Sequence, residues 1–159
     1  MIEDSQKCVG TIERIIEYKD GRETEIDVIH NTVLKTGKAA LAKCLANQVG
    51  AQFEFFINRM LFGDNGTVAS GEPKAVQSDR PGLYGQVVDR KPVIASIDAA
   101  TSPTQVVFTS VLTFDDANTT ISEVAIQMYN QELYSMATFA DLTKDSNMQI
   151  TWNWRLTFV

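Results

Sequence analysis

Apolar and polar residues alternate along the C-terminal end of the chain. Every even position from 148 to 158 is apolar, and every odd position from 149 to 157 is polar. Successive side chains of a strand point to opposite faces, so this period of two predicts one long, half-buried β-strand. Trp152 and Trp154 share its apolar face, where we expect them to be buried. Because a chain end frays unless a sheet holds it, we expect this strand to complete a sheet.

A β-hairpin is predicted within residues 1–30. Residues 9–18 have strand character, Lys19-Asp20-Gly21 is a turn signal, and residues 23–28 alternate between acids on one face and Ile26 and Val28 on the other. His30 continues the face of Ile26 and Val28. We expect it to be a hydrogen-bonded or partly buried strand residue, because no nucleophile motif or ligand cluster accompanies it.

The hydrophobic period changes after the hairpin and predicts the principal helix, near residues 36–47. Thr36 is the expected N-cap, and Asn47 or Gly50 the expected stop. At helical spacing one face would carry five residues, which we expect to point to the core: Leu34, Leu41, Cys44, Leu45 and Gln48.

The remainder of the chain returns to strand character. Strands are predicted at residues 53–62, 87–97, 105–114, 121–129 and 132–139. Residues 63–85 hold five glycines and two prolines and are predicted to form a long surface loop. The sequence therefore predicts a single domain over residues 1–159, mainly β, sandwich-like and antiparallel, with one principal helix.

Charge and composition narrow the possible partners. The net charge of −6 argues against nucleic-acid binding, which needs a basic face; the three neighbouring lysines, Lys35, Lys38 and Lys43, are interpreted as a solvated helix face. The start of the chain lacks the pattern of a signal peptide, and no apolar run is long enough for a membrane span. Cys8 and Cys44 match no metal-binding spacing and are expected to be free, buried thiols in a reducing compartment, with a disulfide as the alternative.

Two polar segments resemble binding loops but lack their essential parts. The segment 63–67, Gly-Asp-Asn-Gly-Thr, has neither the lysine nor the following helix of a phosphate-binding loop. The segment 115–118, Asp-Asp-Ala-Asn, lacks the ligand spacing and glycine of a calcium loop. Both are predicted to be turns.

Two further candidates for chemistry remain as alternatives. Glu123 with Asp141 or Asp145 would suit a glycoside hydrolase if the acids converged in a cleft. Trp152 and Trp154 would suit a sugar-stacking platform if they were exposed. We assign no catalytic, cofactor-binding or metal-binding residue from the sequence.

A series of short motifs runs from residue 31 to the C-terminus. It begins with Asn-Thr-Val-Leu at 31–34, the helix sequence Gly-Lys-Ala-Ala-Leu-Ala at 37–42 and Met-Leu-Phe-Gly-Asp-Asn-Gly-Thr at 60–67. It continues with Ile-Ser-Glu-Val-Ala-Ile at 121–126 and Leu-Tyr-Ser-Met-Ala-Thr-Phe at 133–139. In order and plan this chain resembles small structural proteins of tailed bacteriophages, and in particular the N-terminal attachment domain of phage tail-collar and tail-fibre proteins.

The chain departs from that family pattern at two positions and in length. Ala125 and Gln131 stand where the family commonly has glycine, and the chain ends where a fibre would continue into a shaft. The resemblance thus implies a stand-alone relative located in the virion, within the tail, baseplate, collar or neck. It also implies contacts with other virion proteins, three- or six-fold self-association, and no cofactor, nucleic-acid or membrane partner.

The function expected from the sequence is therefore that of a non-enzymatic structural subunit. The alternatives are a carbohydrate-binding module that assists host attachment and a small cell-wall hydrolase. The loop and the hairpin are the expected contact regions, ordered by docking on a neighbour. The residues expected to form the interface are Val68, Val76, Leu83, Tyr84, Ile12 and Ile16.

Overall fold

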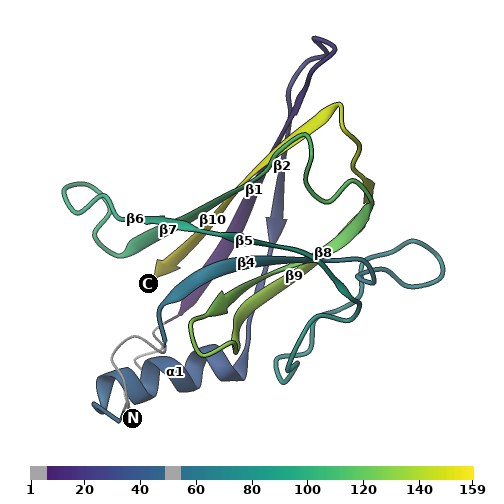
Figure 1. Ribbon diagram of the computed structural model, residues 1–159. Helices are drawn as coiled ribbons and strands as arrows, with labels where there is room; N and C mark the ends of the chain where they lie inside the picture. Colours follow the sequence, from purple (N-terminus) through teal and green to yellow (C-terminus); the bar gives the residue numbers. More distant parts are fainter. Residues whose placement is uncertain (1–6, 49–54) are drawn as a thin grey trace.

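Two antiparallel β-sheets and one helix make up residues 7–48 and 55–159, the part of the chain that the computed structural model describes (Figure 1). The elements are β1 (Cys8–Tyr18), β2 (Glu25–His30), β3 (Thr32–Val33), α1 (Lys35–Leu45), β4 (Ile57–Gly63), β5 (Val87–Pro92), β6 (Ile94–Ser96), β7 (Gln105–Leu112), β8 (Thr120–Met128), β9 (Leu133–Thr143) and β10 (Met148–Phe158). The prediction of a mainly β, sandwich-like fold with one principal helix is confirmed.

The two sheets are joined at both sides by chain segments that turn from one sheet into the other. The first sheet has the strand order β2-β1-β10-β7-β6, and the second has the order β3-β9-β8-β4-β5. Only Asn31 separates β2 from β3, and only Val93 separates β5 from β6. Strands that change sheets in this way form the corners of a β-sandwich. The predicted strand at 87–97 is thus two short strands around a corner.

Strand β10 is the centre of the first sheet, where it pairs with β1 on one side and β7 on the other. Its even-numbered side chains are buried up to Leu156, and the rings of Trp152 and Trp154 are fully enclosed between the sheets. Phe62 and Phe139 from the opposite sheet pack on the Trp152 ring, with centroids 5.2 and 5.6 Å away. The period of two predicted this strand and its buried face correctly.

Two of the predicted interface residues lie in this core. Ile12 and Ile16 have 0% and 1% of their surfaces exposed and pack between the sheets. Their placement on a contact surface was therefore wrong, because the even-numbered face of β1 is the inner face. The outward residues of the hairpin are on β2, where Ile26 and Val28 are 62% and 63% exposed.

The inner face of β1 also carries a charged residue. Arg14 lies between the two isoleucines, with its guanidinium over the rings of Phe139 and Trp152 at 5.2 and 5.8 Å. One of its nitrogens is 2.6 Å from the carboxylate of Asp27 on β2. The aromatic faces and the carboxylate together stabilise a cation that has little contact with water.

The helix has the expected place in the chain but a different buried face. Gly37 and Ala40 face strand β9, whereas Leu41 is partly exposed and Leu45 is 89% exposed. A Cβ atom at Gly37 would lie 2.5 Å from the carbonyl oxygen of Tyr134. The helix packs so closely on β9 that only small residues fit there, and the large apolar residues point outward.

The ends of the helix follow partly from the sequence. The N-cap is Leu34, not Thr36, whose hydroxyl instead donates a hydrogen bond to the carbonyl of Leu133. Asn47 ends the helix with a φ of 52°, in the left-handed region that asparagine tolerates, as one of the two predictions had it. The other expected stop, Gly50, lies outside the described residues. Residues 53 and 54, the start of the strand predicted over 53–62, also lie outside them, and the rest of that prediction corresponds to β4.

Candidate functional site

Glu123 of β8 holds both ends of the loop between β4 and β5. Its side chain is completely buried. One carboxylate oxygen accepts hydrogen bonds from the backbone N–H groups of Asn65 (3.2 Å) and Gly85 (2.7 Å), and the other accepts one from Tyr84 (2.7 Å). Hydrogen bonds to a buried charge are among the strongest in proteins, so this carboxylate fixes the loop on the second sheet.

Glycines allow the loop to approach this carboxylate. A Cβ atom at Gly63 would lie 2.6 Å from an oxygen of Glu123, and one at Gly66 would lie 2.0 Å from the carbonyl oxygen of Ser122. The N–H of Gly66 also donates to the hydroxyl of Ser122 at 2.7 Å. Segment 63–67 is therefore a turn leaving β4, as predicted, and its neighbours in space are residues of β8.

The loop covers the outer face of the second sheet. Val76, Leu83 and Tyr84 are half-buried against a cluster that includes Leu61 and Ala125. We expected these side chains to pack on a neighbouring subunit, but part of their apolar surface already packs within this chain. The fourth predicted loop residue, Val68, is 44% exposed and stays a candidate for contact.

The ring of Tyr84 lies between two cations. The guanidinium of Arg80 is 4.0 Å from its centroid and the ammonium of Lys74 is 4.8 Å away. The Tyr84 hydroxyl donates to the carbonyl oxygen of Ala75 at 2.8 Å. These contacts organise the loop internally, which the glycine-rich sequence did not indicate.

The acids considered for hydrolysis have structural partners. Both oxygens of Glu123 accept backbone hydrogen bonds in a buried site, where water and substrate have no access. Asp141 accepts a hydrogen bond from the hydroxyl of Thr67 at 3.0 Å, and Asp145 accepts one from the N–H of Asn147 at 2.9 Å. The arrangement offers no general acid next to a reacting bond.

The aromatic residues considered for sugar binding are also buried. Because Trp152 and Trp154 are enclosed in the core, they form no platform. An exposed aromatic pair lies elsewhere: the rings of Phe56 and Tyr129 are stacked with centroids 5.3 Å apart. Tyr129 borders a polar pocket of about 480 Å³, whose lining includes Arg59, Arg90 and Gln127.

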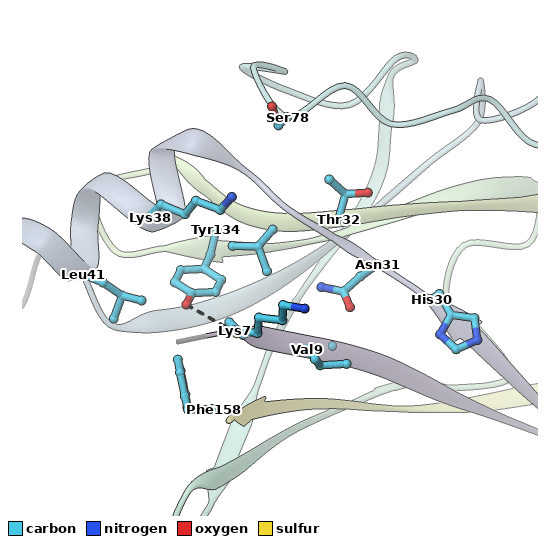
Figure 2. A pocket seen from close by; sticks show the side chains of 13 residues that line it. Lys7, Val9, His30, Asn31, Thr32, Lys38, Leu41, Ser78, Tyr134 and Phe158 are labelled. Atoms are coloured by element: carbon cyan, nitrogen blue, oxygen red, sulfur yellow. Dashed lines mark hydrogen bonds between the residues drawn. The ribbon is translucent and has the colours of Figure 1, made fainter. Parts of the chain in front are cut away.

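A larger pocket of about 740 Å³ opens where the first turns of α1 meet β1, β2 and β3 (Figure 2). Figure 2 shows Lys38 on the helix side and Lys7 on the β1 side, with Tyr134 between them. His30 lies at the far end and is exposed, so the expectation of a partly buried histidine was wrong. Among the residues that the structure describes, the lining contains basic and neutral residues and no aspartate or glutamate.

The floor of this pocket holds a thiol and a phenol. The sulfur of Cys8 and the hydroxyl oxygen of Tyr134 are 4.0 Å apart. Burial raises the pKa of the Cys8 thiol, an effect that the hydrogen bond between Cys8 and Tyr134 partly offsets, and burial also raises the pKa of Tyr134 strongly. Both groups are therefore neutral near pH 7. Cys8 and Cys44 are free thiols in this structure, as expected, but Cys8 is only partly buried and Cys44 is exposed, so the expectation that both are buried was wrong.

The loop 115–118 is a turn between β7 and β8. The carboxylate of Asp116 is 2.6 Å from the ammonium of Lys91, and Asn118 accepts a hydrogen bond from the ammonium of Lys144 at 2.8 Å. Residues 7–48 and 55–159 contain no group of three metal-ligating side chains that could hold an ion. Within the same residues no helix is long and apolar enough to cross a membrane.

Sequence reasoning missed the lysine-lined pocket, because its members are far apart along the chain. Lys7 precedes β1, Lys38 lies on the helix and Tyr134 lies on β9. The lack of any acid between residues 28 and 48 was the available signal, and we had interpreted the lysines there as a solvated face. No protein-family model, curated protein or solved structure matches this chain.

Proposed function

We propose that this chain is a non-enzymatic structural subunit of a tailed-phage virion, located in the tail, baseplate, collar or neck. It works through protein–protein contacts with other virion components and with copies of itself, in three- or six-fold symmetry. Its assembly takes place in the cytoplasm of the host bacterium.

The observation that carries this proposal is the convergence of the motif residues. The segment with Asn31 and Thr32 meets the hairpin motif at Ser135, which receives a hydrogen bond from the Asn31 amide and donates one to the Thr32 carbonyl. The Gly63–Gly66 turn meets the strand motif at Glu123. The polar groups of the motifs thus hold the second sheet, the helix and the loop together. The residues that carry the resemblance are therefore residues that fix this fold, which supports a structural function.

The surface supports a function in contact. Large apolar side chains are exposed on both ends of the molecule and on the edges of the first sheet. They are Val9, Ile26, Val28, Leu41, Leu45, Ile94, Ile97 and Phe158. These side chains are the candidates for burial against another protein, because exposed apolar patches mark contact sites where their members are contiguous.

Mass spectrometry of purified particles tests the proposal directly. The chain should be present at a fixed copy number relative to the major tail protein, and antibody labelling in electron microscopy should place it on the tail or neck. If particles lack the chain while infected cells contain it, the proposal is refuted.

The carbohydrate-binding alternative is favoured by the stacked pair Phe56 and Tyr129 beside a pocket with two arginines. Exposed aromatic rings next to hydrogen-bonding side chains suit sugar recognition. A glycan array with the purified protein tests this function. Binding that Tyr129→Ala abolishes, and that Phe158→Ala, outside the lining of this pocket, leaves unchanged, would favour this alternative over the structural subunit.

A further inference from the structure

Two consecutive segments of the chain carry opposite charge. Residues 17–27, around the tip of the β1–β2 hairpin, contain five acids and two basic residues, a net charge of −3. Residues 28–48, which continue through β2, β3 and α1, contain three lysines and no acid, a net charge of +3. The hairpin tip and the helix lie at opposite ends of the molecule (Figure 1).

The acidic end has carboxylates available for a partner. Asp20 is paired with Arg22 at 2.7 Å and Asp27 with Arg14 at 2.6 Å. Glu23 and Glu25 form no ion pair among the described residues, and both are exposed. Ile26 follows Glu25 on the edge strand, with its side chain on the opposite face and 62% of its surface exposed. This end therefore offers exposed acids on one face of the hairpin and an apolar side chain on the other.

The basic end has the complementary composition. Its pocket is bordered by the exposed ammonium groups of Lys7 and Lys38, neither of which forms an ion pair within the described part of the chain. Leu41 and Phe158 line the same pocket and leave over a third of their surfaces in water. A carboxylate that enters this pocket can pair with the ammonium group of Lys7 or Lys38, and an apolar side chain can pack on Leu41 and Phe158.

We propose that the hairpin end of one copy docks in the lysine-lined pocket of the next copy. The carboxylates of Glu23 and Glu25, which share one face of the hairpin, contact the ammonium groups of Lys7 and Lys38, and Ile26 is left on the opposite face. Because the hairpin end and the pocket lie at opposite ends of the molecule, a head-to-tail contact leaves one of each unoccupied, and repeated contacts close into a ring or extend into a filament. The inference depends on the proposed function only for where the contact occurs, namely in the virion. The contact itself is a property of the purified protein and can be tested without phage particles.

The test uses purified full-length protein in sedimentation velocity over a concentration series. The parent protein should associate at low salt and dissociate at about 1 M salt, where the screening length shrinks to about 3 Å. E23K/E25K and K7E/K38E should each weaken association at least tenfold. A monomer at every concentration, or an assembly that salt leaves unchanged, would overturn the proposal.

Mixing the two variants is the decisive arm. In an equimolar mixture each hairpin meets a pocket of opposite charge, so association should return. Non-specific adhesion would not be rescued in this way, and failure of rescue with both variants folded refutes the proposal. Association that stops at the dimer shows a reciprocal two-fold contact and refutes the head-to-tail arrangement. E72K and R90E serve as matched charge reversals outside both surfaces, and circular dichroism verifies the fold of every variant.

The outcome is separable from that for the proposed function. If the chain assembles head-to-tail in solution but is missing from virions, only the location in the phage is wrong. If it is present in virions but monomeric in every sedimentation experiment, only the head-to-tail contact is wrong.

Discussion

Replacing Glu123 by glutamine tests whether this carboxylate holds the loop in place. The glutamine oxygen can take the place of the oxygen that accepts from Asn65 and Gly85. Its amide nitrogen then faces the N–H of Tyr84, which loses its acceptor at 2.7 Å. A buried hydrogen bond to a charged group contributes about 1.5–3 kcal/mol, and relief of the cost of burying the charge offsets part of the loss.

We therefore expect Glu123→Gln to lower the free energy of unfolding by about 2 kcal/mol. For a domain of this size that lowers Tm by about 4–8 °C, measured by calorimetry. Hydrogen exchange should show the loss at the loop ends, because the N–H groups of Tyr84 and Gly85 become less protected than amides in β10.

Asp141→Asn is the matched control for this experiment. Asp141 is exposed and accepts a single side-chain hydrogen bond from Thr67, so its neutralisation should change stability by less than about 0.5 kcal/mol. If Glu123→Gln leaves both Tm and the protection of the loop unchanged, the carboxylate does not anchor the loop and the reasoning is wrong.

Three further predictions concern Gln131, the two tryptophans and the two cysteines. Gln131 has a φ of 73°, so Gln131→Gly should stabilise the protein by about 0.5–1 kcal/mol in urea unfolding, because relief of left-handed strain exceeds the entropy cost of glycine; a lower urea midpoint would contradict this. Trp152 and Trp154 are buried, so their fluorescence should be blue-shifted and poorly quenched by acrylamide, and ready quenching would show an open core. A thiol reagent should modify exposed Cys44 before Cys8, whose pKa is raised by burial, and raising the pH should speed the Cys8 reaction; equal rates at pH 7 would argue against this environment.

Elements with a local signal could be predicted from the sequence. The alternation in β10 predicted the strand and the buried face of both tryptophans, because side-chain direction in a strand depends only on position. Asp20-Gly21 marked the hairpin turn for the same kind of reason, since glycine readily adopts the φ of 81° found there. Such features involve neighbouring residues alone.

The buried face of the helix could not be predicted in this way. Leucines at helical spacing usually mark the core side, but the close approach of α1 to β9 admits only Gly37 and Ala40. That approach depends on strand β9, about a hundred residues later in the chain. The same limit applied to Ile12 and Ile16, whose inner position follows from the pairing of β1 with β10.

By itself the sequence determined the fold class, the buried and exposed positions of β10, and the turns, because these depend on local stereochemistry and short-range hydrophobic periodicity. Only the tertiary structure decided the function of Glu123 in holding the loop and the placement of Lys7 beside Lys38. Both depend on contacts between segments distant along the chain, and such contacts form only when the two sheets close around a common core.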